Sequence, residues 1–262
     1  MNIQNYLDVA IEAALKTGKN LESNFGNVKH FTKKADEEEK GINIVTKFDK
    51  EAEKDLAERL LKYDNTVGFH GEEFGEIKKG EKMWLVDPID GTAHYVRGIP
   101  VCTTMISLVD QGEVLVSVIY DFLRNNLFSA TKNGGAFLNS KPIHVSKRSL
   151  KDAYICLESK LETEEERQIF FNLRKHAVVI TQATSGYEYA LVAQGKLDGR
   201  ISINPWARIW DFAAGCLLVK EAGGTVKNIG KDTYEYTNMD IIATNPVIYR
   251  ELNSGILTNT KS

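Results

Sequence analysis

Cysteine is scarce in this chain, and its three cysteines lie far apart. Cys102, Cys156 and Cys216 sit in apolar segments, and no Cys-x-x-Cys pair occurs. An odd number of dispersed cysteines argues against a disulfide framework and against a zinc knuckle. We therefore expect three small core residues in a reducing compartment, and a cytoplasmic protein.

Proline, long apolar runs and an excess of positive charge are also missing. Only five prolines occur in 262 residues, and no proline-rich or glycine-rich linker divides the chain. No apolar run approaches the roughly 20 residues that span a bilayer, so we expect no membrane association. The net charge of -3 suggests no nucleic-acid partner. With 42% hydrophobic residues, the chain can bury a core as one large domain or two closely joined lobes.

The first part of the chain has the pattern of helices followed by an antiparallel sheet. Apolar residues recur at the helical period from the N-terminus to Gly18, which would end the helix, and again over 49–63. Thr46 and Asp49 have capping-box spacing at the start of the second helix. The runs CTTMISLV, VLVSVIYDF, LFSAT and AFLN in 101–139 are separated by turn-forming clusters. They predict an antiparallel meander.

From about residue 150, strands alternate with helices. The strand-like runs DAYICLE, AVVIT, GRISI and MDIIATN each precede a helical segment. Helices are expected at 163–176, 186–195 and 211–222 and near the C-terminus. This alternation predicts an α/β lobe, residues 149–262, packed on an N-terminal α+β lobe, residues 1–148.

The stretch WLVDPIDGTAHYVRGIP, residues 84–100, places two carboxylates at the end of an apolar strand. Asp87 and Asp90 flank a Pro-Ile pair, and Gly91 and Thr92 follow at once. An aspartate in a turn often bonds its own backbone, so an ordinary turn is one interpretation. A helix that begins after this turn would present free N–H groups to an anion, and glycine would let a phosphate approach. A metal and phosphate cradle therefore fits equally well.

Two further segments favour the cradle. Glu72 lies in the glycine-bounded turn HGEEFG, and Asp211 opens the apolar helix WDFAAG. Alone, these suggest a solvated loop and an N-cap. Together with Asp87 and Asp90 they form a set of four carboxylates beside glycines or helix starts, where backbones can converge. Like charges a few ångströms apart repel by about 4 kcal/mol per pair at an effective dielectric of 20. The set predicts a divalent cation, and its all-oxygen donors favour Mg²⁺ or Mn²⁺ over zinc.

Three motifs resemble, in this order, the signatures of the inositol monophosphatase family: GEE, DPIDGT with GIP, and WDFAAGCLLVKEAGG. The members of that family are lithium-sensitive, Mg²⁺-dependent phosphatases. The segments NIVTKFDKEAE, KNGGAFLNSKPIHVS and SGYEYALVAQGKLDG are similar to further family segments, so the resemblance covers nearly the whole chain. It implies a layered αβαβα sandwich of the sugar-phosphatase type with the site between the lobes. It also implies a small-molecule phosphate ester as substrate, and a homodimer.

The resemblance also implies a ligand set, which the N-terminal lobe mostly supplies. Glu72, Asp87 and the backbone carbonyl of Ile89 would bind one Mg²⁺. Asp87, Asp90 and Asp211 would bind a second, and a third, weaker ion would lie near Glu72. Two ions about 3.5–4 Å apart can stabilise both the attacking and the leaving oxygen of an in-line displacement.

Around the attacking water, the resemblance implies a catalytic group of Glu72, Thr92 and Asp49. Thr92, supported by Asp49, would orient the water, and the backbone N–H groups of Gly91 and Thr92 would hold the phosphate. No covalent phosphoenzyme is expected. The implied substrate-facing residues are Asp90, Gly91, Thr92, Asn204 and Asp211.

Several positions depart from the family pattern, so the substrate stays open. Asn204 stands where inositol-specific members carry glutamate, Ala183 where arginine is common, and His94 where asparagine is common. Fructose-1,6-bisphosphatase, nucleotide 3′-phosphatase and histidinol-phosphatase activities are alternatives, although GYEY lacks the nucleotide-phosphatase pattern. Arg200 and Arg208 are either structural or contacts for a second anionic group of the substrate.

Two other classes of protein compete with this interpretation. Haloacid-dehalogenase-type phosphatases carry Asp-x-Asp-Gly-Thr, whereas two residues separate the aspartates of this motif, so that class is excluded. A metal-binding interaction module with a vestigial site is the non-enzyme alternative.

Overall fold

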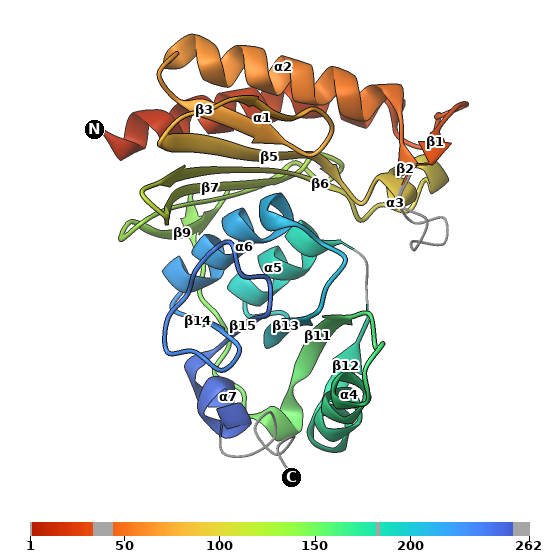
Figure 1. Cartoon of the computed structure of the whole chain (residues 1–262), viewed down its shortest axis with the longest axis vertical. Coiled ribbons are helices and arrows are strands. Elements are labelled where there is room, and N and C mark those ends of the chain that lie inside the picture. Colours follow the sequence, from red (N-terminus) through yellow and green to blue (C-terminus); the bar gives the residue numbers. More distant parts are fainter. Residues whose placement is uncertain (1, 34–43, 182–183, 254–262) are drawn as a thin grey trace.

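The computed structural model describes residues 2–33, 44–181 and 184–253. Two β-sheets are layered with helices above, between and below them (Figure 1). The outer helices on the first sheet are α1 (Ile3–Asn24) and α2 (Lys47–Tyr63). The middle layer holds α5 (Ser185–Ala193) and α6 (Ile209–Glu221). The outer helices on the second sheet are α4 (Glu164–His176) and α7 (Pro246–Glu251). The layered αβαβα arrangement that the resemblance implied is confirmed.

The first sheet has eight strands in the order β10-β9-β8-β7-β6-β5-β3-β4. Their bounds are β3 Gly68–Gly71, β4 Gly75–Lys78, β5 Lys82–Asp90, β6 Thr103–Asp110, β7 Glu113–Asp121, β8 Asn126–Thr131, β9 Gly135–Leu138 and β10 Lys141–Pro142. Strands β6 to β9 form the predicted antiparallel meander. The departure from an antiparallel sheet is the parallel pair of β3 and β5. The short helix α3 (Thr92–Arg97) follows β5, and β1 (Thr32–Lys33) pairs with β2 (Ile44–Val45) apart from this sheet.

The second sheet is mixed and has the order β12-β11-β13-β15-β14. Its strands are β11 Tyr154–Ser159, β12 Val178–Ile180, β13 Gly199–Ile203, β14 Thr225–Asn228 and β15 Ile241–Thr244, and a 3₁₀ turn, η1 (Leu150–Asp152), precedes them. Strand β11 runs parallel to β12 and β13, whereas β15 is antiparallel to both of its neighbours. The sequence did not predict β14, whose four residues TVKN lack an apolar run.

The middle layer joins the two sheets. Leu85 and Met105 from the first sheet share one buried cluster with Phe212 of α6 and Ala243 of the second sheet. Both faces of helix α6 are buried, and its sequence accordingly lacks a polar stripe. The predicted boundary between residues 148 and 149 falls between β10 and β11, and the division into two lobes stays a prediction.

Helix α1 corrects one prediction. It continues past Gly18 to Asn24, so Gly18 is an interior residue and not a cap. A Cβ at Gly18 would lie 2.4 Å from Cε1 of Tyr120 in β7, so glycine is required for the close approach of helix and sheet rather than for a turn. The capping box of α2 is confirmed, since the backbone N–H of Thr46 donates to Asp49 Oδ2 at 2.7 Å.

All three cysteines are free and buried, as predicted. Among the described residues, no helix combines the length and the apolar character that crossing a membrane demands.

Candidate active site

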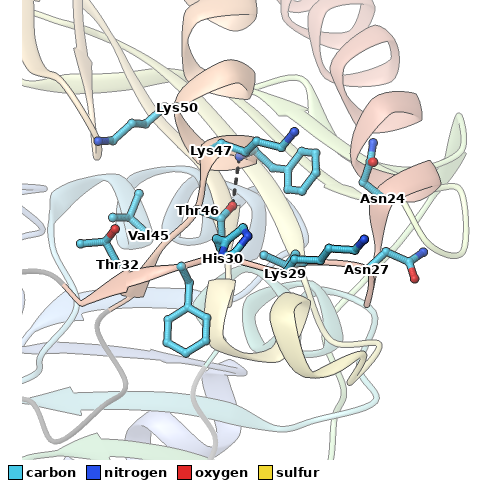
Figure 2. A pocket seen from close by; sticks show the side chains of 12 residues that line it. Asn24, Asn27, Lys29, His30, Thr32, Val45, Thr46, Lys47 and Lys50 are labelled. Atoms are coloured by element: carbon cyan, nitrogen blue, oxygen red, sulfur yellow. Dashed lines mark hydrogen bonds between the residues drawn. The ribbon is translucent and has the colours of Figure 1, made fainter.

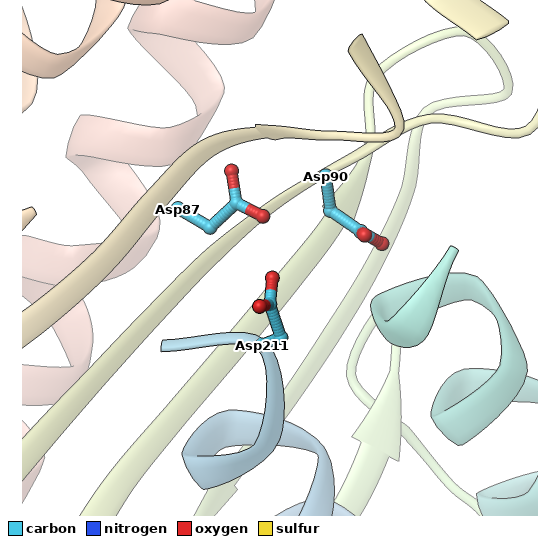
Figure 3. A group of neighbouring side chains, drawn as sticks. All are labelled: Asp87, Asp90 and Asp211. Atoms are coloured by element: carbon cyan, nitrogen blue, oxygen red, sulfur yellow. The ribbon is translucent and has the colours of Figure 1, made fainter. Parts of the chain in front are cut away.

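Three aspartates from two distant segments converge between the layers (Figure 3). Asp87 and Asp90 lie at the end of β5, and Asp211 lies in the first turn of α6. One carboxylate oxygen from each lies within 4.8 Å of the others. Asp87 and Asp90 are buried and Asp211 is half-buried. The motifs predicted a convergence of four carboxylates, and the fold brings three of them together by placing α6 against the first sheet.

A bulge in β5 explains how two residues three apart can face the same side. Asp87 is opposite Met105 and Asp90 is opposite Thr103, so β5 has one residue more than β6 over this interval. Successive residues of a regular strand face opposite sides, and residues three apart would therefore diverge. The extra residue, beside Pro88, restores the same side.

Asp90 is also bound to the second half of the chain. Its Oδ2 accepts from the backbone N–H of Gly186 at 2.7 Å, and its Oδ1 from that of Ser185 at 3.1 Å. Thr103 Oγ1 lies 3.1 Å from Oδ2. The N–H groups belong to the first turn of α5, where a negative charge is favoured. Asp90 therefore ties the end of β5 to α5, and the motif gave no sign of these partners.

The other two aspartates are oriented by local backbone groups. Asp87 Oδ1 accepts from the N–H of Ile89 at 3.0 Å, in the manner of an Asx turn. Asp211 Oδ2 accepts from the N–H of Arg208 at 2.6 Å, across the start of α6. The sequence suggested Asp211 as the N-cap of α6, but the N-cap is Arg208, and Asp211 is the third residue of the helix and bonds back to it. This bond leaves the other carboxylate oxygen to face Asp87 and Asp90.

Burial is the largest electrostatic effect on the three carboxylates, and mutual repulsion adds to it at Asp87 and Asp211. Burial, followed by the charges of Glu72, Asp211 and Asp90, raises the pKa of Asp87 well above its usual range. Burial and the charges of Glu72 and Asp90 do the same to the pKa of Asp211. The pKa of Asp90 rises to about 6, because burial outweighs the bonds from Gly186 and Ser185. Among the described residues, no lysine or arginine forms an ion pair with these three aspartates.

Glu72 stands at the edge of this group. It lies in the turn between β3 and β4, and its N–H donates to the carbonyl of Val86, the residue before Asp87, at 3.1 Å. It is not one of the three mutually close carboxylates. After burial, the charge of Glu72 is nevertheless the largest cause that raises the pKa of both Asp87 and Asp211.

Thr92 and Asp49 lie in direct contact, as the resemblance implied. Thr92 Oγ1 lies 2.7 Å from Asp49 Oδ1 and 3.0 Å from the carbonyl oxygen of Ile89. The carboxylate at the shorter distance is the stronger acceptor, so we assign donation to Asp49. Asp49 is fully buried, and its second oxygen accepts from the backbone N–H and the hydroxyl of Thr46 at 2.7 and 2.6 Å. Burial raises the pKa of Asp49, and these hydrogen bonds oppose the rise.

The donors of this site suit a hard divalent cation. All are oxygen atoms, and three of them lie close enough to contact one ion. Burial is the largest cause of their raised pKa values, and repulsion between the carboxylates adds to it at Asp87 and Asp211. A bound cation would remove that repulsion. The acidic cluster could therefore hold a metal ion.

Gly91 is required by its surroundings. It adopts φ +90°, and a Cβ there would lie 2.6 Å from Thr184 Cγ2 and 3.0 Å from the carbonyl oxygen of Val101. A side chain at this position would therefore be strained and would clash. The bend lets α3 begin at Thr92, two residues after Asp90.

The side chain of Asn204 bonds two glutamates at and just before the start of α4, and not the residues that bond Asp90. Its Nδ2 donates to Glu166 Oε1 at 3.1 Å and to Glu162 Oε2 at 3.2 Å. Its contact with a substrate stays a prediction, and would need the amide to leave these two carboxylates. Ala183 lies outside the described residues. His94 lies in α3, where burial lowers the pKa of its imidazole.

Arg200 proves to be structural. Its side chain is 2% exposed and forms ion pairs with Glu188, at 2.8 Å, and with Glu158. Its Nη2 also donates to Ser185 Oγ at 2.8 Å, and its guanidinium lies 5.0 Å from the ring centre of Phe212. Arg200 therefore packs behind Ser185, whose N–H bonds Asp90, and behind Phe212, which follows Asp211 in the chain. Arg208, the second arginine in question, is exposed.

A separate cavity of about 590 Å³ lies at the start of α2 (Figure 2). Lys29, His30, Lys47 and Lys50 line it, and none of the three aspartates does. Thr46 lines the cavity and also bonds Asp49, so the cavity adjoins the Thr92 side of the site. The chemistry is assigned to the carboxylates because they supply the converging ligand atoms.

The comparisons with known proteins agree with this geometry. A sequence model of the inositol monophosphatase family matches residues 2–261. This chain belongs to the inositol monophosphatase family. An inositol-1-monophosphatase of Rhizobium meliloti (strain 1021) is 35% identical over 230 residues, which cover 83% of each chain. A fructose-1,6-bisphosphatase/inositol-1-monophosphatase of Aquifex aeolicus is 32% identical over 256 residues, covering 95% of this chain and 94% of the relative.

A solved structure shares the fold. The crystal structure of the extragenic suppressor protein suhB from Bartonella henselae has a TM-score of 0.87 and 31% identity, and the match covers 97% of this chain and 98% of that one. With family membership shown over nearly the whole length, the protein is an inositol monophosphatase family enzyme, a phosphoric monoester hydrolase.

Proposed function

We propose that this family member hydrolyses a small sugar or inositol phosphate, with Mg²⁺ as its metal and water as the nucleophile. The observation that carries the proposal is the convergence of Asp87, Asp90 and Asp211 beside a threonine hydroxyl held by Asp49. Hydrolysis of a phosphomonoester needs cationic charge at the phosphoryl oxygens and a fixed nucleophile, and it needs little else from the protein.

Two overlapping sets of residues would hold the metal. Glu72, Asp87 and the Ile89 carbonyl would hold one Mg²⁺, and Asp87, Asp90 and Asp211 would hold another. Mn²⁺ would suit the same oxygen donors. When bound, Mg²⁺ lowers the pKa of a water molecule and offsets charge on the phosphoryl and leaving oxygens.

The chain's own groups would orient the reactants. Since Thr92 donates its hydroxyl proton to Asp49, its lone pairs stay available to accept a hydrogen bond from the attacking water. The backbone N–H groups of Gly91 and Thr92 would bind phosphate oxygens, and the missing side chain of Gly91 leaves room for that approach. Glu72 would complete the catalytic group on the water side.

Phosphate release from a panel of esters tests the proposal. The panel contains inositol 1-phosphate, fructose 1,6-bisphosphate, 3′-phosphoadenosine 5′-phosphate and histidinol phosphate, each with and without Mg²⁺ and with added Li⁺. We expect Mg²⁺-dependent release from the inositol or fructose ester, in keeping with the Aquifex relative's name. Metal binding without release from any ester would instead favour the interaction module. A preferred nucleotide or histidinol ester would replace the proposed substrate class.

Replacing Thr92 by alanine is expected to lower turnover by about 100-fold, because the attacking water loses its hydrogen-bond acceptor. Metal affinity should stay close to wild type, since the Ile89 carbonyl and the aspartates remain. Steady-state kinetics at saturating Mg²⁺ measures the loss, and Thr92→Ser, which keeps the hydroxyl, is the matched control. An unchanged turnover number for the alanine variant would remove Thr92 from the mechanism.

Other properties stay predictions from the resemblance. They are a homodimeric assembly, a cytoplasmic location and sensitivity to lithium, and the lithium arm of the ester panel tests the last of these.

A further inference from the structure

Glu53 of α2 is a buried acid to which the sequence analysis gave no role. Its side chain is fully buried, and its carboxylate accepts hydrogen bonds from two backbone N–H groups of the turn between β3 and β4. Oε2 accepts from Glu73 at 2.7 Å and Oε1 from Phe74 at 2.9 Å. Hydrogen bonds to a carboxylate are roughly twice as strong as those between neutral groups. Glu53 therefore clamps the turn between β3 and β4 with both of its oxygens.

The clamped turn is the one that carries Glu72. On one side of Glu72, a Cβ at Gly71 would lie 2.2 Å from Glu53 Cδ, so the clamp requires glycine there. On the other side come the two bonded N–H groups. The N–H of Glu72 itself donates to the carbonyl of Val86, beside Asp87. The backbone of this turn is thus fixed between α2 and β5.

The same helix also holds Thr92, the residue proposed to orient the attacking water. Asp49 lies four residues before Glu53, and residues four apart share one face of a helix. Asp49 is as deeply buried as Glu53 and bonds the hydroxyl of Thr92. One face of α2 therefore holds Thr92 through one carboxylate and the turn of Glu72 through the other.

We propose that Glu53 is a positioning residue that aims the Glu72 carboxylate at the metal site, so that α2 sets the placement of Glu72 relative to Thr92. The inference rests on the proposed function in one respect, the assignment of Glu72 as a metal ligand. A purely structural alternative is that Glu53 only attaches the β3–β4 hairpin to α2. The two readings differ in what they predict for metal affinity.

Glu53→Gln is the variant of choice because it keeps the shape of the side chain. Its amide oxygen can accept one of the two N–H groups, but its NH₂ group faces the other donor. Loss of an outer partner of a metal ligand typically weakens metal binding by about 10–100-fold. We expect a 10–100-fold rise in the Mn²⁺ dissociation constant of one site, measured by titration calorimetry of the full chain. The Mg²⁺ concentration for half-maximal activity should rise in parallel.

Controls separate the possible failures. Glu51→Gln changes an exposed glutamate of the same helix and should leave Mn²⁺ affinity unchanged. Glu72→Gln should weaken the same site as Glu53→Gln does. If Glu72→Gln binds Mn²⁺ like wild type, the ligand assignment fails. If Glu72→Gln weakens binding while Glu53→Gln lowers only the melting temperature, the positioning role is overturned. Should Glu53→Gln not fold, Glu53→Asp, which keeps the charge but shortens the reach, is measured by the same criterion.

Discussion

Asp90→Asn is expected to lower turnover on the order of 1,000-fold, beyond the 10–100-fold typical of an outer-shell partner. The substitution removes a charge that would hold a cation and hardly changes the shape of the side chain. The asparagine oxygen can still accept from Gly186 or Ser185, so the join between β5 and α5 should largely persist. Phosphate release at saturating Mg²⁺ measures the effect, and Mn²⁺ titration reports the lost affinity.

A buried aspartate away from the cluster gives the matched control. Asp198, 1% exposed, pairs with Arg148 and bonds the N–H of Tyr154. Asp198→Asn should reduce stability without reducing turnover of the folded protein. Turnover of Asp90→Asn within a few-fold of wild type would refute a metal-binding role for Asp90, whatever its stability.

Arg200→Met is expected to cost about 3–5 kcal/mol of unfolding free energy, the range found when one partner of a buried ion pair is removed. Glu188 and Glu158 would lose the guanidinium between them, and Glu188 is 2% exposed. Urea unfolding monitored by circular dichroism measures the loss. Arg208→Met, which changes an exposed arginine, should stay within about 0.5 kcal/mol of wild type.

The loss of unfolding free energy in Arg200→Met should depend on pH. Burial already raises the pKa of Glu188 to about 7 despite the opposing charge of Arg200. A carboxyl with a raised pKa in the folded state favours folding when protonated, and that contribution disappears as pH rises through the folded pKa. Without Arg200 the pKa rises further, so Arg200→Met should be less destabilised at pH 5 than at pH 8. The double variant Arg200→Met with Glu188→Gln should regain part of the loss. Equal destabilisation at both pH values would exclude Glu188 as its source.

Local features of the chain could be predicted because they depend on residues a few positions apart. The capping box of Thr46 and Asp49 follows from three-residue spacing, and the meander follows from alternation between turn clusters. Gly18 shows the limit of such reasoning. Glycine near a helix end usually marks a cap, but here the cause is Tyr120, about a hundred residues away.

The acidic residues of the site could likewise be predicted from the sequence, but their hydrogen-bond partners could not. The types and order of the acidic residues, read as motifs, pointed to a divalent cation before any geometry was available. The partners that hold them did not appear in any motif. Asp90 meets α5 some 95 residues later in the chain, Glu53 meets the turn after Glu72 across 20 residues, and Arg200 is buried between two glutamates.

By itself, the sequence determined the family, the class of chemistry and most secondary structure, since each of these rests on side-chain type and short-range periodicity. Only the tertiary structure decided which side chains stand behind the ligands, and that Arg200 serves the interior rather than a substrate. The physical reason is that burial depends on how two sheets and three helical layers pack together. That packing brings together residues whose separation along the chain carries no local signal.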